Sequence, residues 1–82
     1  MARFYLHIRN GGGYAEDPEG QELSSLAAAR TAAIDGVRSL LSEEARQGEL
    51  DFSGSIEIAD EEGNVLLIVP FSEAISLRAY PR

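Results

Sequence analysis

The chain of 82 residues contains no cysteine and no lysine, and it has a single histidine, His7. The absence of cysteine excludes a disulfide framework, a thiolate nucleophile and any zinc site that uses sulfur. Without lysine, Schiff-base chemistry has no side-chain amine to use. One histidine cannot form a histidine-based transition-metal cluster within one chain. The sequence therefore predicts no metal centre, no cofactor and no catalytic residue.

Long apolar runs are also missing. No stretch approaches the ~20 apolar residues of a membrane-spanning helix, and His7 and Arg9 interrupt the N-terminal segment where a signal-peptide core would lie. The formal charge is -7 with a pI near 4.5, so phosphate backbones and anionic lipids repel the chain. We expect a soluble cytoplasmic protein with no membrane partner, and we do not expect nucleic acid as a partner.

The length indicates one domain, with a core over about residues 3–71 and a C-terminal tail over 72–82. A chain of this size buries only about 60% of the surface that its unfolded form exposes. Small domains near this length often gain stability from a staple or from a partner subunit. A homodimer is therefore plausible from length alone.

The first strand is predicted by strict alternation over residues 3–9, in which Phe4, Leu6 and Ile8 alternate with polar residues. Asn10-Gly11 then predicts a hairpin turn, followed by one short return strand between residues 14 and 23. Two Asp-x-x-Gly segments, at residues 17–20 and 60–63, predict β-turns.

The helix is predicted over residues 24–46, which are rich in alanine and leucine and contain no proline. Ser24 or Ser25 would be its N-cap, and Gly48 would follow its end. The residues expected on its apolar stripe are Leu26, Ala29, Ala33, Val37, Leu40 and Leu41.

The clearest hairpin spans residues 55–69, where an alternating strand is followed by the apolar run VLLIV, residues 65–69. Because that run is apolar at every position, we expect both of its faces to be buried. The second face would be covered by the tail or by another chain. The predicted fold is α+β, a two-layer β-β-α-β-β arrangement with a four-stranded, mostly antiparallel sheet covered by one helix.

Known ligand-binding motifs do not fit. The run Gly11–Gly13 lacks the Gly-Lys-Ser/Thr ending of a phosphate-binding loop and the spacing of a dinucleotide fingerprint. The acidic turns offer oxygen ligands, yet the glycine of the calcium-loop template is Glu22 in one case and Val65 in the other. Solvated turn carboxylates are the favoured interpretation.

Two surfaces remain as candidates for interaction. Tyr5, His7, Arg9 and Glu57 should share one sheet face as a small polar patch, either as exposed ion-paired residues or as a ligand or partner site. The helix also carries a strip of small residues that would let another backbone approach closely. Its central members are Ala28, Ala32 and Gly36.

Four segments carry a family resemblance that runs from Phe4 to about Phe71: FYLHIR, DPEGQEL, AAARTAAIDGVRSLL and IEIADEEGNVLLIVPF. Together they resemble a short uncharacterised domain-of-unknown-function family that is common in rhizobia and related alphaproteobacteria. The resemblance implies a bacterial protein. Where that family has an Asp-Gly turn after its first strand, this chain has Asn10-Gly11 and two further glycines. The family supplies no catalytic residues to carry over.

The functional prediction is a small cytoplasmic, non-enzymatic protein-interaction module that associates with itself as a homodimer, with another protein as the second choice of partner. One alternative is an antitoxin that neutralises a small toxin, since the hairpin and helix resemble the topology of HicB-type antitoxins without sharing a specific motif. The other is a small-ligand or enzymatic site around His7, with Tyr5 or Glu57.

Overall fold

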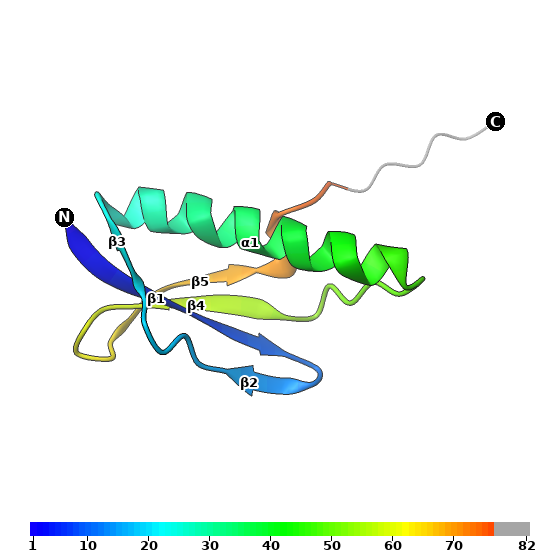
Figure 1. Cartoon of the computed structure of the whole chain (residues 1–82), viewed down its shortest axis with the longest axis horizontal. Helices are drawn as coiled ribbons and strands as arrows, with labels where there is room; N and C mark the ends of the chain where they lie inside the picture. The colour runs from blue at the N-terminus through cyan, green and yellow to red at the C-terminus, as the bar shows by residue number, and fades with distance from the viewer. Residues whose placement is uncertain (77–82) are drawn as a thin grey trace.

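The structure, a computed structural model, describes residues 1–76 and has two layers (Figure 1). One layer is a five-stranded sheet and the other is a single long helix, α1, that lies across one face of the sheet. The elements in chain order are β1 (Ala2–Asn10), β2 (Gly13–Ala15), β3 (Gln21–Leu23), α1 (Leu26–Arg46), β4 (Ser55–Ala59), β5 (Val65–Pro70) and the short 3-10 helix η1 (Phe71–Glu73). The predicted α+β class, with one helix on an antiparallel sheet, is confirmed.

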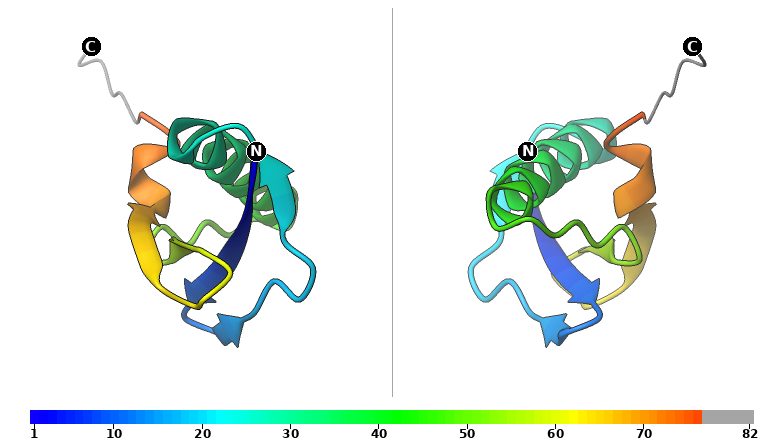
Figure 2. Two further views of the ribbon diagram at one scale, coloured as in Figure 1. Left: turned by 90° about the vertical axis from the view of Figure 1, so that its left-hand side faces the viewer. Right: turned by 90° about the vertical axis from the view of Figure 1, so that its right-hand side faces the viewer.

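The sheet has the strand order β2-β1-β4-β5, and β3 pairs with the beginning of β1. β2 and β3 lie along the same side of β1, joined by a loop that swings out between them (Figure 2). They are two halves of one edge strand that is interrupted at residues 16–20. The sequence predicted one continuous return strand, so the sheet has five strands where four were expected.

The helix begins and ends close to the predicted residues. Ser25 is the N-cap, and its Oγ accepts a hydrogen bond of 3.1 Å from the backbone N–H of Ala28. Gln47 is the C-cap, so Gly48 follows the helix end as predicted. The residues that α1 buries against the sheet are Ala29, Ala33, Ile34, Val37 and Leu41. Leu26 was predicted on this stripe but is exposed, because it lies in the first turn at the end of the helix.

The core fills the space between α1 and the sheet. Its strand residues are Phe4, Ile56, Ile58 and Val69, and Phe71 of η1 closes one end. Gly54 lies directly against Phe71: a Cβ there would be 2.5 Å from Phe71 Cε2 and 2.7 Å from the carbonyl oxygen of Arg9. Only glycine fits at this close approach of the backbone to the core.

The predicted burial of both faces of residues 65–69 is wrong for the part of the chain that the structure describes. Leu67 is half-buried and Val69 is buried on the side of α1, whereas Leu66 and Ile68 are 43% and 55% exposed. The tail does not cover them as far as residue 76, because Ala74 is buried in the core and its carbonyl accepts a hydrogen bond from Arg38 Nε. Residues 77–82 lie outside the described residues.

A β-bulge explains why the outer side of β5 is so apolar. Ile58 pairs with Leu67, but the next residue, Ala59, pairs with Val65, so β5 has one extra residue at this point. Paired residues point to the same face of a sheet, which turns Val65 away from α1. Strict alternation would have placed Val65 on the same face as Leu67, toward α1. We call the three exposed residues Val65, Leu66 and Ile68 the β5 patch.

Candidate functional site

The candidate site is the sheet face opposite α1, called the open face below. Cross-strand pairing aligns His7 with Glu57 and Glu57 with Ile68, and it aligns Tyr5 with Ala59 and Ala59 with Val65. The face therefore changes from polar and aromatic on β1 to apolar on β5. This arrangement brings together Tyr5, His7, Arg9 and Glu57, the four sheet residues that the sequence grouped.

The charges in the middle of the open face are paired with each other. Arg9 Nε lies 3.1 Å from Glu57 Oε2, and the Arg9 guanidinium lies 4.6 Å from the ring centroid of Tyr14. The Tyr14 hydroxyl donates to Glu57 Oε1 at 3.4 Å. Desolvation and the negative charge of Glu57 raise the pKa of Tyr14. Sequence reasoning missed Tyr14, because its place on this face follows only from the register of β2 on β1.

Asp17 holds the interrupted edge strand together. Its Oδ2 accepts the backbone N–H of Leu6 at 3.2 Å, at the point of β1 where neither β2 nor β3 supplies a partner. Its Oδ1 accepts the N–H groups of Glu19 and Gly20. Partial burial by itself would raise the pKa of Asp17, but the backbone donors at Gly20, Leu6 and Glu19 outweigh it and lower the pKa.

His7 is tied to the same loop. Its Nδ1 accepts a hydrogen bond of 3.0 Å from the backbone N–H of Asp17, which places the proton of the neutral ring on Nε2. The ring stacks on Tyr5 at a centroid distance of 6.3 Å and lies 5.8 Å from that of Tyr14. Nδ1 is thus used for structure, which leaves this nitrogen no role as a general base in the fold described.

A hollow of about 230 Å³ opens on this face between the two acidic turns. It is lined by Tyr5, His7, Glu16, Asp17, Pro18, Asp60, Glu61 and Gly63. We call it the acidic hollow, because it gathers four carboxylates. Val65 follows closely on its lining residue Gly63, so the β5 patch adjoins the acidic hollow.

The second turn is stabilised by its own carboxylate. Asp60 Oδ1 accepts the N–H groups of Glu62 and Asn64, and the N–H of Gly63 donates to the Asp60 carbonyl at 3.1 Å. The hydrogen bonds from Asn64 outweigh desolvation and lower the pKa of Asp60. In residues 1–76, no group of three or more acidic or histidine side chains is arranged to hold a metal ion.

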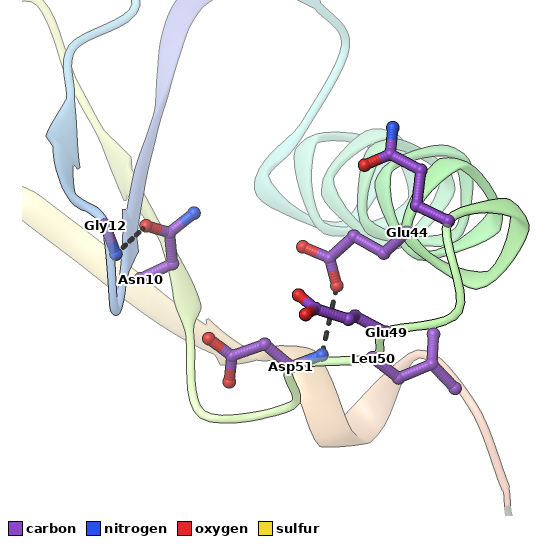
Figure 3. A pocket seen from close by; sticks show the side chains of 7 residues that line it. Asn10, Gly12, Glu44, Glu49, Leu50 and Asp51 are labelled. Carbon is purple, nitrogen blue, oxygen red and sulfur yellow. Dashed lines mark hydrogen bonds between the residues drawn. The ribbon is translucent and has the colours of Figure 1, made fainter.

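A larger hollow of about 560 Å³ lies elsewhere, between the β1–β2 turn and the loop after α1 (Figure 3). Glu44 Oε1 accepts the backbone N–H of Asp51 at 3.0 Å, and Asn10 Oδ1 accepts that of Gly12 at 2.8 Å. Asp51 in turn accepts from both the N–H and the hydroxyl of Ser53. These side chains order the loops that they belong to, and they assemble no nucleophile or acid–base pair.

The small-residue strip of α1 is only partly covered by the described residues. Ala28 and Ala32 are half-buried and Gly36 is exposed. A Cβ placed on Gly36 would meet nothing within 4 Å. The described part of the chain therefore gives no reason for glycine there, and the strip stays a prediction.

In the described residues, α1 is not apolar enough to cross a membrane.

Comparison with known proteins adds one match. No curated protein matches the chain, and no solved structure matches it. A family model described as "Domain of unknown function (DUF6894)" matches residues 3–72, which is most of the sequence. Because the matched region runs from β1 into η1 and includes α1, this chain belongs to the DUF6894 family of domains of unknown function.

Proposed function

We propose that the protein is a small non-enzymatic module that binds other proteins in the cytoplasm through its open face. The observation that carries the proposal is the β5 patch. Three large apolar side chains, each between 43% and 55% exposed, lie next to one another on a sheet face that no described element covers. Contiguous exposed apolar residues rimmed by polar ones are typical of protein-binding surfaces.

The rest of the face supports a binding role over a catalytic one. Tyr5 on β1 and Tyr14 on β2 add aromatic surface to the other side of the same face, and tyrosine is enriched in protein interfaces. The ion pair of Arg9 with Glu57 leaves few unpaired charges to desolvate at the centre. The enzymatic alternative around His7 has less support, because its Nδ1 is held by the Asp17 backbone.

The sequence supported self-association by predicting that both faces of residues 65–69 are buried. One of these faces is exposed, so that support is lost. A second copy therefore stays one possible partner among others. No observation in residues 1–76 favours the antitoxin alternative.

The test compares three versions of the full chain as bait in the native cytoplasm. Ile68→Thr removes apolar surface from the open face and keeps a residue that favours strands. Leu50→Thr is the matched control, because Leu50 is 49% exposed in the loop after α1, away from β5. The wild type and Leu50→Thr should retain the same partner at similar yield, and Ile68→Thr should lose most of it.

Equal capture by all three baits would contradict the proposal, as would the absence of any specific partner. Sedimentation equilibrium of the purified wild type shows in parallel whether the retained partner is a second copy. Circular dichroism of each variant confirms that a loss of capture does not come from unfolding.

A further inference from the structure

We propose that the partner of the open face is a basic and apolar segment of another protein, whose apolar side chains cover the β5 patch and whose arginine or lysine enters the acidic hollow. This inference rests on the proposed function and names the chemistry of its partner. Its basis is the adjacency of the two features on one face, which the cross-strand rows of residues establish.

The distances fit a short segment. Tyr5 on β1 and Val65 on β5 flank Ala59 in one row, so they are two strand spacings apart, which is about 10 Å. An extended peptide covers that distance with about three residues. One short segment can therefore place an apolar side chain on the β5 patch and a cationic one in the acidic hollow.

The negative charge of the acidic hollow favours a basic partner over an uncharged or acidic one. Glu16, Asp17, Asp60 and Glu61 line the hollow, and its only basic lining residue is His7. Charge complementarity across an interface determines which partners are accepted and suppresses like-charged ones. A cationic side chain would also meet Tyr5 and His7, whose rings are stacked at the hollow.

A second copy fits less well than a basic partner. All five arginines of residues 1–76 already lie within 4.0 Å of a carboxylate in the same chain: Arg3, Arg9, Arg30, Arg38 and Arg46. A second copy would therefore bring another acidic hollow to the interface, and no arginine of residues 1–76 that lacks a carboxylate partner. The remaining two arginines, Arg78 and Arg82, lie outside the described residues, and the experiment below tests them.

Edge-to-edge pairing of β5 with another strand is disfavoured as well. The N–H of Phe71 donates to the Gly54 carbonyl, which continues the register of β4 and β5 by one residue. The backbone N–H and C=O groups of successive residues on β5 point to opposite sides. Those of Phe71 point toward β4, so those of Ile68, three residues earlier, point away from β4 to the free edge. On one side of Ile68 is Pro70, which has no N–H, and on the other is the bulge at Leu66. Prolines and bulges are the usual means of blocking an edge strand. The contact is therefore made by side chains on the face.

The experiment titrates the full ¹⁵N-labelled chain with three capped hexapeptides and follows the backbone amide signals. One peptide has leucine in its first half and arginine in its second half, so that leucine and arginine side chains two residues apart share one face of the extended peptide. The second has serine in place of leucine, and the third has glutamate in place of arginine. Only the leucine–arginine peptide should bind well, and it should shift the signals of Tyr5, His7, Leu66 and Ile68. Ile68→Thr, and separately the pair Glu16→Gln and Glu61→Gln, should each weaken binding about tenfold.

The pair Glu43→Gln and Glu49→Gln is the matched control, since it makes the same change in net charge in α1 and in the loop after it. It should leave the affinity unchanged. Equal binding of the serine–arginine peptide would overturn the inference, because charge alone would then suffice. Shifts confined to α1, or no shift at millimolar peptide, would overturn it as well.

Two further outcomes separate this inference from the proposed function. If bait capture depends on Ile68 while the leucine–arginine peptide does not bind, the basic partner is wrong and the binding face stands. If the pair Arg78→Gln and Arg82→Gln moves the signals of Leu66 and Ile68 in the free protein, the chain's own C-terminal segment is the occupant, and the inference of a separate basic partner is overturned.

Discussion

Replacing Asp17 by alanine should destabilise the fold by about 2 to 4 kcal/mol. The carboxylate accepts three backbone N–H groups, those of Leu6, Glu19 and Gly20. The Leu6 amide is part-buried and has no strand partner, so its loss of an acceptor costs about 1 to 3 kcal/mol. The Glu19 and Gly20 amides can turn to water, and each adds only about 0.5 kcal/mol.

Asp17→Asn should lose less stability than Asp17→Ala. The amide keeps one acceptor oxygen, so it can hold either the Leu6 amide or the two turn amides but not all three. We expect it to lose about 1 to 2 kcal/mol. For a domain of this size, each kcal/mol lowers Tm by about 4 to 8 °C, so Asp17→Ala should melt about 8 to 30 °C below the wild type.

The assay is urea and thermal unfolding followed by circular dichroism at pH 7. Asp35→Ala is the control for the loss of one negative charge, since Asp35 lies on the exposed surface of α1 and its carboxylate is 4.0 Å from Arg38. That control should stay within about 0.5 kcal/mol of the wild type. If Asp17→Ala also stayed within that range, the view that this side chain replaces the missing edge-strand contact would be refuted.

Three further predictions concern stability. Gly54→Ala should cost more than about 2 kcal/mol in urea unfolding, because its Cβ would lie 2.5 Å from Phe71 Cε2; wild-type stability would show that the backbone yields there. Gly36→Ala should stabilise the helix by about 0.5 to 1 kcal/mol, since its Cβ meets nothing, and a loss would mean that this surface is covered. Backbone hydrogen bonds lower the pKa values of Asp17 and Asp60, and hydrogen bonds from Ser53 lower that of Asp51. These carboxylates therefore contribute to the free energy of unfolding at pH values above 3.8, their ordinary pKa, and the contribution is lost as pH falls through their lower pKa values in the folded state. Asp17→Ala should flatten that acid limb in pH-dependent unfolding, and an unchanged limb would count against the assignment.

Regular periodicity is what made much of the fold predictable from the sequence. β1 and β4 alternate strictly, and the alanine-rich helix is bounded by Ser25 and Gly48. The pattern also grouped His7 with Glu57, because two alternating strands in one sheet must present their polar sides together.

The features that define the candidate site have no such signal. The β5 bulge lies in a run that is apolar throughout, so no alternation reveals that Val65 turns outward. The split of the edge strand depends on the Asp17 carboxylate reaching the Leu6 amide, a tertiary contact that no local pattern encodes. The acidic hollow joins the two turns of Asp17 and Asp60, whose similarity is visible in the sequence while their proximity is not.

The most direct test of the open face as a binding surface is an amide chemical-shift map of the full chain, titrated with the partner that the wild-type bait retains. The account predicts that the largest changes fall on Val65, Leu66 and Ile68 and extend to Tyr5. Changes centred on Ala28, Ala32 and Gly36 of α1, with the β5 signals unmoved, would contradict it.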